Sequence, residues 1–345
     1  MTHQVADTAS LVALRAGLAA HAHATPAAPA DTLRALVANG LDRLPLPGHG
    51  ATLERWRALA AVGARDLSLA KLFEGHTDAL AILHEAGAVQ LAAAKAALWA
   101  TWCAEPPDAR LLMAKGAGGK PVLRGRKAWC SGARDVSHAV VSCWSPDGAA
   151  LLAAVDLRQP GVSVTDDGWH AVGMAATLSV DVHFDDVPAT PLGGPDFYVQ
   201  RAGFWHGGAG VAACWFGAAT RLANALRERS GGRADPHRLA QLGEVTVALQ
   251  GCAAMLRETA SAIDRAPDDD AMLAALSVRL GVEAGANVVL NAVGRALGAG
   301  PLCKDAALAR MYADLPVFLR QSHAERDQQA VGSLVATQER APWTL

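Results

Sequence analysis

The sequence predicts an α+β fold in which a helical N-terminal domain, a central β domain and a C-terminal helical domain follow one another. Apolar residues recur at helical spacing over roughly the first hundred positions, short apolar or alternating runs follow, and helical spacing returns after residue 204. The chain has 345 residues, 51% of them hydrophobic, which suffices for the cores of two or three domains. We expect the domain boundaries at residues 1–97, 98–195 and 196–345.

The N-terminal domain is expected to be helical throughout. Apolar side chains share one face over residues 10–18, and Asp31-Thr32 is placed to cap a helix that stops at Gly40. The same spacing recurs over residues 52–64 and 67–86. These segments contain no strand pattern, so the first domain is predicted to hold helices alone.

The central and C-terminal domains differ in the length of their apolar runs. Glycine- and proline-containing turns separate the short central runs, which predicts a small β-barrel or sandwich. The central runs lie at residues 121–123, 139–143, 151–156, 162–164 and 178–184. The later helical segments lie at residues 210–229, 238–263, 270–296 and 303–321.

Charge and composition exclude several classes of protein. The net charge of −2 comes from 31 basic and 33 acidic residues spread along the chain, so nucleic acid is not an expected partner. No run approaches the roughly eighteen apolar residues of a membrane span, and the N-terminus lacks the order of a signal peptide. We therefore expect a cytoplasmic protein.

The six cysteines form no CxxC pair, and His21 and His23 alternate in position, so no metal site is predicted.

Two short motifs have stronger structural than catalytic interpretations. Residues Gly208 to Ala213 fit a GxGxxA pattern, but no strand-helix-strand unit surrounds them, so small residues at a packed helix start explain them better. Ser322, His323 and Asp327 contain the residue types of a hydrolase triad. However, neighbouring residues rarely point at one another, and the chain has no GxSxG elbow.

The stretch around Trp129 is more informative. There an indole is followed by Cys130, Ser131 and Gly132 at the end of a predicted strand. Such a sequence builds a flat apolar wall beside a hydroxyl donor and exposed backbone, which suits a planar heteroaromatic ring. The alternative is a core tryptophan next to a turn.

Several ordered stretches resemble the acyl-CoA dehydrogenase family over nearly the whole chain. Lys127 to Gly132 resembles the family's Lys-x-Trp-Ile-Thr-Asn-Gly strand, and Thr101 to Pro106 resembles its Tyr-Cys-x-Thr-Glu-Pro segment. Val182 to Pro188 resembles the signature that closes the family's β domain. The resemblance implies a helical domain, a small central β-barrel and a C-terminal four-helix bundle. It also implies a homo-oligomer, a dimer or tetramer, with electron-transfer flavoprotein as a possible partner.

The resemblance further implies FAD as cofactor. The residues expected along the flavin ring are Trp102, Cys103, Ala104, Trp129, Cys130 and Ser131. Arg229 and Arg233 lie where the family has an Arg-x-x-Phe-Gly segment that reaches a pyrophosphate, although the Phe-Gly is absent. Arg295 and Gly298 lie at a turn that resembles the family's adenosine contact.

The family's catalytic glutamate is missing. Its usual position falls on Ser322, and the helix that carries it in a second subgroup, near residues 207–217, has no acidic residue here. His323 or Glu325 is the candidate substitute, since histidine is a competent base with an ordinary pKa of roughly 6.5. The alternative is a solvated start of a helix with Ser322 as its cap and Glu325 three residues later.

A second departure affects substrate binding. After Glu105-Pro106 the family continues with Gly-x-Gly-Ser-Asp, whereas this chain has residues 107–110 reading Pro-Asp-Ala-Arg. The main prediction is a FAD-dependent oxidoreductase of lipid metabolism that acts on a CH-CH group of an acyl thioester, carried by CoA or a carrier protein. The alternatives are a flavin-dependent monooxygenase of the same fold and a catalytically silent homologue that binds flavin or thioester.

Overall fold

The computed structural model describes residues 7–21, 29–93, 97–232 and 235–343, so His23 and Arg233 lie outside the described residues. Contacts divide the chain into two compact units. The sheet unit comprises residues 1–44, 68–171 and 175–204, and the bundle unit comprises residues 45–67, 172–174 and 205–345. The three domains expected from the sequence stay a prediction, because the contacts distribute the N-terminal helices over both units.

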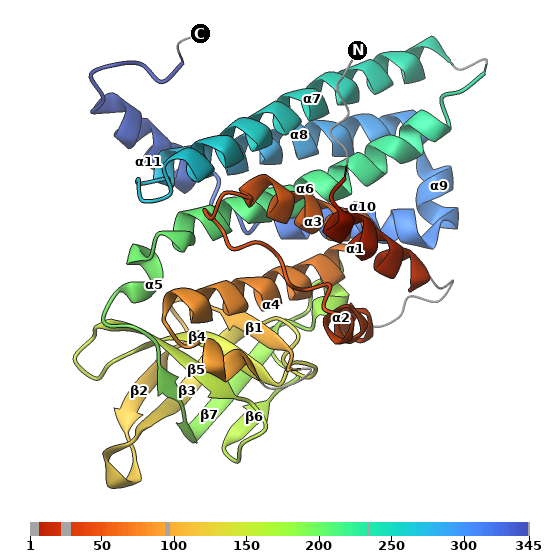
Figure 1. Cartoon of the computed structure of the whole chain (residues 1–345). Coiled ribbons are helices and arrows are strands. Elements are labelled where there is room, and N and C mark those ends of the chain that lie inside the picture. The colour runs from red at the N-terminus through yellow and green to blue at the C-terminus, as the bar shows by residue number, and fades with distance from the viewer. Residues whose placement is uncertain (1–6, 22–28, 94–96, 233–234, 344–345) are drawn as a thin grey trace. The chain divides into compact units, whose positions relative to one another are not determined.

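The sheet unit contains a single mixed sheet in the order β6-β7-β3-β2-β4-β5-β8, with β1 added in parallel beside β4 (Figure 1). Open edges at β6 and β8 make it a half-barrel, which confirms the predicted β domain. The strands are β1 (Trp99–Trp102), β2 (Leu111–Lys115), β3 (Pro121–Cys130), β4 (His138–Trp144), β5 (Ala150–Asp156), β6 (Val162–Val164), β7 (Val180–Pro188) and β8 (Thr190–Pro191).

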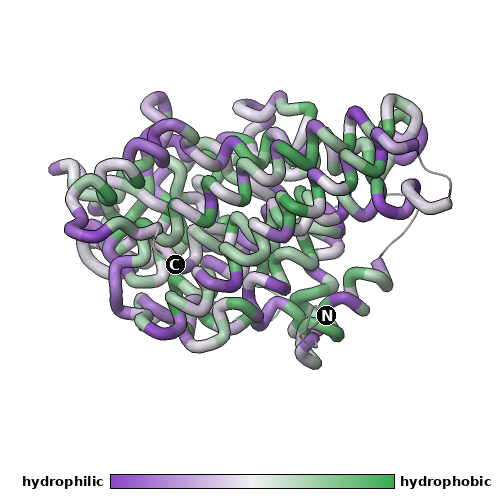
Figure 2. Tube along the Cα trace, turned by 90° about the horizontal axis from the view of Figure 1, so that it is seen from above, coloured by the Kyte–Doolittle hydropathy of each residue, from purple (hydrophilic) through white to green (hydrophobic). Residues whose placement is uncertain are grey.

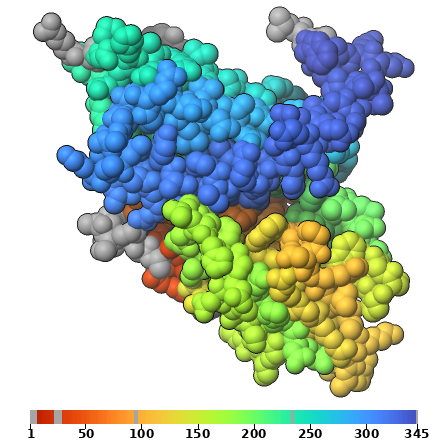
Figure 3. Space-filling model, turned by 180° about the vertical axis from the view of Figure 1, so that it is seen from behind, coloured from red at the N-terminus to blue at the C-terminus, as the bar shows by residue number. Residues whose placement is uncertain are grey.

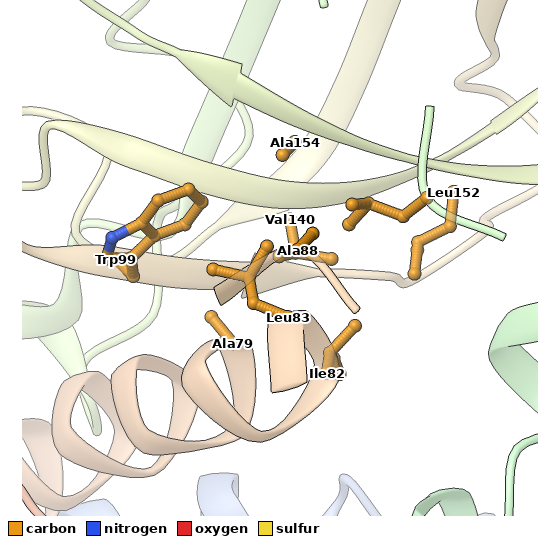
Figure 4. Packing of buried hydrophobic residues seen from close by; sticks show 9 residues of the cluster. Ala79, Ile82, Leu83, Ala88, Trp99, Val140, Leu152 and Ala154 are labelled. Atoms are coloured by element: carbon orange, nitrogen blue, oxygen red, sulfur yellow. The ribbon is translucent and has the colours of Figure 1, made fainter. Parts of the chain in front are cut away.

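Helix α4 (Leu67–Glu85) packs on the sheet. Ala79, Ile82 and Leu83 recur at helical spacing and meet buried side chains of β1, β4 and β5, among them Trp99 and Val140 (Figure 4). Full burial of an isoleucine or leucine side chain, such as Ile82 or Leu83, contributes about 1.5–3 kcal/mol to stability. The unit also contains α1 (Ala9–Ala20), α2 (Pro29–Ala38) and α5 (Phe197–Gln200).

A buried arginine fastens the end of the sheet unit to α4. Arg201 Nη1 lies 2.6 Å from Glu85 Oε2, and Arg201 Nη2 lies 3.6 Å from Asp78 Oδ1. The other oxygen of Glu85 accepts the backbone N–H of Gly203 at 2.8 Å. The guanidinium also lies 5.3 Å from the ring centre of Tyr198. Residues 198–203 are thereby held by charge-assisted hydrogen bonds to one helix.

The bundle unit confirms the predicted C-terminal helical bundle. Its helices are α3 (Thr52–Arg65), α6 (Gly203–Glu228), α7 (Pro236–Arg265), α8 (Met272–Leu297), α9 (Ala299–Lys304), α10 (Ala306–Leu319) and α11 (Glu325–Ala336). Gly63 and Gly217 bring α3 and α6 into backbone contact, since a Cβ on either glycine would overlap a carbonyl of the other helix. Hydrophobic and hydrophilic residues alternate along the helical coils in Figure 2, as amphipathic helices require.

Helices α7 and α8 are long and apolar enough to cross a membrane by length and composition alone. A core helix of a soluble protein passes the same test, and half of the apolar window of α8 is buried in the bundle unit. Only 17% of the window of α7 is buried, and Leu239, Val247 and Met255 are exposed on it. The predicted dimer or tetramer, which would cover such a surface, stays a prediction, as does the cytoplasmic location.

A buried carboxylate anchors residues 172–174 within the bundle unit. Asp314 of α10 accepts the backbone N–H of Met174 at 2.6 Å. Burial raises the pKa of Asp314 to about 6, and Asp66 raises it further, against the opposing effects of the Met174 hydrogen bond and Arg310. The carboxyl group that binds Met174 therefore has a raised pKa and loses its proton only at a higher pH than an ordinary aspartate.

We expect Asp314→Asn to stabilise the protein above pH 6 and to have little effect near pH 4. The native state binds this proton more tightly than the unfolded state, whose pKa is 3.8. Ionisation therefore removes up to about 3 kcal/mol from the unfolding free energy as the pH rises from 4 to 6. Asparagine keeps the Met174 acceptor without the charge. Melting temperatures of both proteins between pH 4 and 8 test this, and a difference that is constant over that range contradicts it.

Candidate functional site

Trp129 occupies a bulge in β3. The register between β3 and β7 shifts between Lys127 and Cys130, and Trp129 takes a left-handed backbone conformation with φ 57°. A bulged strand turns a side chain away from the regular alternation. Trp129 is accordingly 52% exposed, whereas Trp99 and Trp102 of the same sheet unit are buried. The alternative interpretation of Trp129 as a core residue is wrong.

A tight turn follows the bulge and fixes Ser131. The Ser131 N–H donates to Trp129 O at 3.0 Å, and Ser131 O accepts Nε1–H of Trp102 at 3.1 Å. Gly132 then adopts φ 70°, where a Cβ would lie 2.7 Å from Leu72 Cδ2. The Trp-x-Ser-Gly pattern is thus typical of this turn. Glycine is required at its last position because the backbone has a positive φ and because a Cβ would clash with Leu72.

Two of the predicted ring-lining side chains point into the core instead. Cys130 is fully buried and donates its thiol to Lys127 O at 3.3 Å, and Trp102 is buried beneath the turn. The bulge that exposes Trp129 leaves Cys130 paired with Val180 of β7, and the indole N–H of Trp102 is bound to Ser131 O. Cys103 and Ala104 are half-buried, and burial raises the pKa of the Cys103 thiol to about 11. Trp102 therefore supports the wall, and Trp129 and Ser131 form it.

A buried lysine next to the wall was not anticipated from the sequence. Lys127 Nζ donates to Glu105 Oε1 at 2.5 Å, to Ser142 O at 2.9 Å and to Ser142 Oγ at 2.7 Å. Trp144 Nε1 donates to the other oxygen of Glu105 at 2.8 Å. The contact fixes the Glu105-Pro106 loop to β3 and β4. Residue type alone could not single out Lys127, because β3 also contains Arg124 and Arg126, which are not buried.

His323 and Asp327 form a pair in the bundle unit. Asp327 Oδ2 accepts the backbone N–H of His323 at 3.1 Å, and Asp327 Oδ1 lies 3.4 Å from His323 Nδ1. Asp327 is buried, whereas the His323 side chain is 65% exposed. A carboxylate at Nδ1 orients the ring and leaves Nε2 facing outward, an arrangement typical of proton-transfer histidines.

The start of α11 differs from the capping box considered above. The helix begins at Glu325, and its N-cap position is Ala324 with φ 45° and ψ −111°. Ser322 accepts the N–H of Ala324 at 3.2 Å and caps no helix, while Asp327 reaches back to His323. Glu325 is exposed as the first helical residue. A positive φ at alanine is strained, and such strain is found preferentially at functional turns.

Helix α8 holds the backbone that precedes His323. Arg279 is buried and donates to Gly208 O at 2.8 Å and to Gln321 O at 3.0 Å. Its guanidinium lies 5.2 Å from the ring centre of Trp215. One helical turn later, Glu283 pairs with Arg320. These α8 residues fix the end of α10, so the turn with His323 starts from a rigid point.

The predicted phosphate and adenosine residues lie at the surface of the bundle unit. Arg229 follows α6, donates to Ala225 O at 3.0 Å and lies 3.7 Å from Asp305, the N-cap of α10. Arg295 and Gly298 are exposed at the end of α8, and Gly298 has φ 63°. The short helix α9 follows them directly. Helices α8 to α11, in blue, form much of the bundle surface in Figure 3.

Comparison with known proteins identifies the class. Residues 108–187 match the family model described as acyl-CoA dehydrogenase, middle domain. A dibenzothiophene monooxygenase from Rhodococcus erythropolis is 33% identical over 168 residues, and one from Rhodococcus qingshengii matches equally well. These matches cover 40% of this chain and only 40% of the relatives' length.

Solved structures share the fold over nearly the whole chain. TdsC from Paenibacillus sp. A11-2 with bound FMN has a TM-score of 0.78 at 19% identity, and 96% of this chain and 97% of TdsC are covered. Methanesulfinate monooxygenase MsuC from Pseudomonas fluorescens has a TM-score of 0.79 at 22% identity, with the same coverage. KijD3, in complex with FMN and a dTDP-sugar, has a TM-score of 0.77 at 22% identity, with coverage of 97% and 93%. The chain thus has the fold of these structures, and its residues 108–187 match the middle domain of the acyl-CoA dehydrogenase family, as its motifs predicted.

Proposed function

We propose that this protein is a flavin-dependent monooxygenase that acts on a small molecule. The observation that carries the proposal is the replacement of the family's catalytic carboxylate position by Ser322, followed by the His323–Asp327 pair. Removal of an acidic α-proton from a thioester needs that carboxylate, whereas oxygen activation does not. The dibenzothiophene and methanesulfinate monooxygenases named above point the same way. Acyl thioester dehydrogenation, our main prediction from the sequence, has less support.

FMN suits the proposal better than the FAD predicted from the sequence. TdsC and KijD3 are described with FMN bound, and FMN has no adenosine for Arg295 and Gly298 to contact. Arg229 remains a candidate for a phosphate, because its guanidinium is partly exposed. Trp129 offers an exposed indole to an isoalloxazine ring, and the largely buried Ser131 carries a hydroxyl two residues later, bonded to Ser179 Oγ. A bound reduced flavin supplies the electrons that activate oxygen.

The residues of this chain then have distinct tasks. Trp129 would hold the ring and shield one side of it from water, and Ser131 would offer it a hydrogen bond. Lys127 and Glu105 hold the strand that carries this wall. His323 holds or delivers a proton at Nε2, with its ring orientation set by Asp327. The electron donor is a separate reductase, in place of the electron-transfer flavoprotein predicted above.

Titration with FMN and FAD, followed by visible absorption, tests the proposal. We expect Trp129→Ala to raise the flavin Kd by about 5- to 150-fold, since aromatic stacking and burial contribute about 1–3 kcal/mol. Trp343→Ala, which removes an indole that is 75% exposed, is the matched control and should bind flavin like the parent.

The same preparation separates the candidate functions. A monooxygenase converts a substrate such as a thiophene or a sulfinate to an oxygenated product, and it does so only when a reductase supplies reduced flavin in the presence of oxygen. Anaerobic bleaching of bound flavin by an acyl-CoA would instead establish a dehydrogenase. A protein that binds neither flavin refutes the proposal.

A further inference from the structure

Three buried hydroxyl groups form a row next to the Trp129–Ser131 turn. Ser131 Oγ lies 2.8 Å from Ser179 Oγ, which lies 2.9 Å from Thr177 Oγ1. The three residues are 9%, 4% and 1% exposed, respectively. The carbonyl of Thr177 accepts the N–H of Gly132 at 2.8 Å, so the row and the turn are fastened together.

The backbone of Ser131 is already engaged, which leaves its hydroxyl for a ligand. Its N–H donates to Trp129 O, and its carbonyl accepts from Trp102 Nε1. A serine hydroxyl has one proton and two lone pairs, and Ser179 uses one of these three positions. The direction of the hydrogen bond to Ser179 therefore decides whether the Ser131 hydroxyl can donate to a ligand or only accept from it.

We propose that Ser179 and Thr177 are positioning residues that make the Ser131 hydroxyl a hydrogen-bond donor to the flavin. The inference rests on the function proposed above. A carbonyl oxygen or ring nitrogen at the edge of the flavin accepts a hydrogen bond, and this acceptor makes all hydrogen bonds of the row point the same way. Thr177 then donates to Ser179, Ser179 donates to Ser131, and Ser131 donates to the flavin. Each bond polarises the next, and burial strengthens all of them.

A double-mutant cycle on flavin binding tests the row. We expect Ser131→Ala and Ser179→Ala each to raise the Kd for FMN by about tenfold and to shift the visible absorption band alike. Because both changes act on the same Ser131–flavin hydrogen bond, one by removing the hydroxyl and one by removing the neighbour that orients it, the double variant should bind no more weakly than Ser131→Ala. Thr177→Val should act in the same direction with a smaller effect.

Two further variants control for the fold. Thr165→Val removes a hydroxyl that donates to Asp181 O at 2.8 Å, outside the row, and should bind FMN like the parent. Ser179→Thr keeps the hydroxyl and should restore both the Kd and the absorption band. Melting temperatures identify any variant that fails to fold.

The outcomes distinguish this inference from the proposed function. If the parent binds neither FMN nor FAD, both are overturned. If the parent binds flavin and Ser179→Ala keeps its Kd and spectrum, only the inference falls. Losses that add in the double variant show that Ser179 merely supports the fold, and they overturn the inference as well.

Discussion

His323→Ala is expected to lower the turnover number of the reductase-coupled reaction by about 10²–10⁴, the usual contribution of a general acid or base. The imidazole is the titratable group that its surroundings orient for proton transfer. Asp327 holds Nδ1 and the backbone N–H, and the strained Ala324 fixes the turn. The flavin Kd should stay near the parent value, because His323 acts on the proton and not on cofactor affinity. Stopped-flow absorption with added reduced FMN measures both quantities.

Two variants sharpen this expectation. Glu325→Ala is the matched control, since Glu325 was the other base candidate and lies exposed at the first position of α11. It should keep most of the turnover. Asp327→Asn retains an acceptor for the His323 N–H but removes the charge beside Nδ1, so it should lower turnover less than His323→Ala. Loss of turnover in Glu325→Ala with an active His323→Ala would reverse the assignment.

The architecture was predictable because apolar periodicity is a local property of the sequence. Helices such as α4 and strands such as β4 follow from spacing alone. The turn that ends the strand was predicted for the same reason, since Trp129 to Gly132 follow one another in the sequence. Its orientation was not, because a bulge in β3 decides which side chain faces outward and the pairing with β7 creates that bulge.

Contacts between distant residues could not be derived from the sequence. Ser131 and Ser179 are separated by 48 positions, and Arg201 and Glu85 by 116. The residues around Asp327 did not indicate that Asp327, and not Ser322, would accept the backbone N–H of His323, because serine and aspartate both cap helices. The short helix α9 was not predicted. Glycine at position 298 indicates the end of a helix, and α8 does end there, but α9 begins at the next residue.

Arg201→Ala is expected to lower the unfolding free energy by about 3–5 kcal/mol, the usual effect of removing one partner of a buried ion pair. The side chain is 3% exposed and faces Glu85 and Asp78, so its loss leaves two partly buried carboxylates without a cation. The Gly203 N–H bond to Glu85 and the packing of Tyr198 on the core cluster then hold residues 198–203. Urea unfolding followed by tryptophan fluorescence measures the loss.

An exposed pair supplies the control that separates burial from charge. Arg158→Ala breaks an ion pair with Asp156 in which the arginine is 66% exposed, and it should change the unfolding free energy by less than about 1 kcal/mol. Combining Arg201→Ala with Glu85→Gln should recover part of the loss, because one stranded carboxylate is then neutral. If Arg201→Ala costs no more than Arg158→Ala, the link between α4 and α5 depends on apolar packing, and the buried charges contribute no net stability.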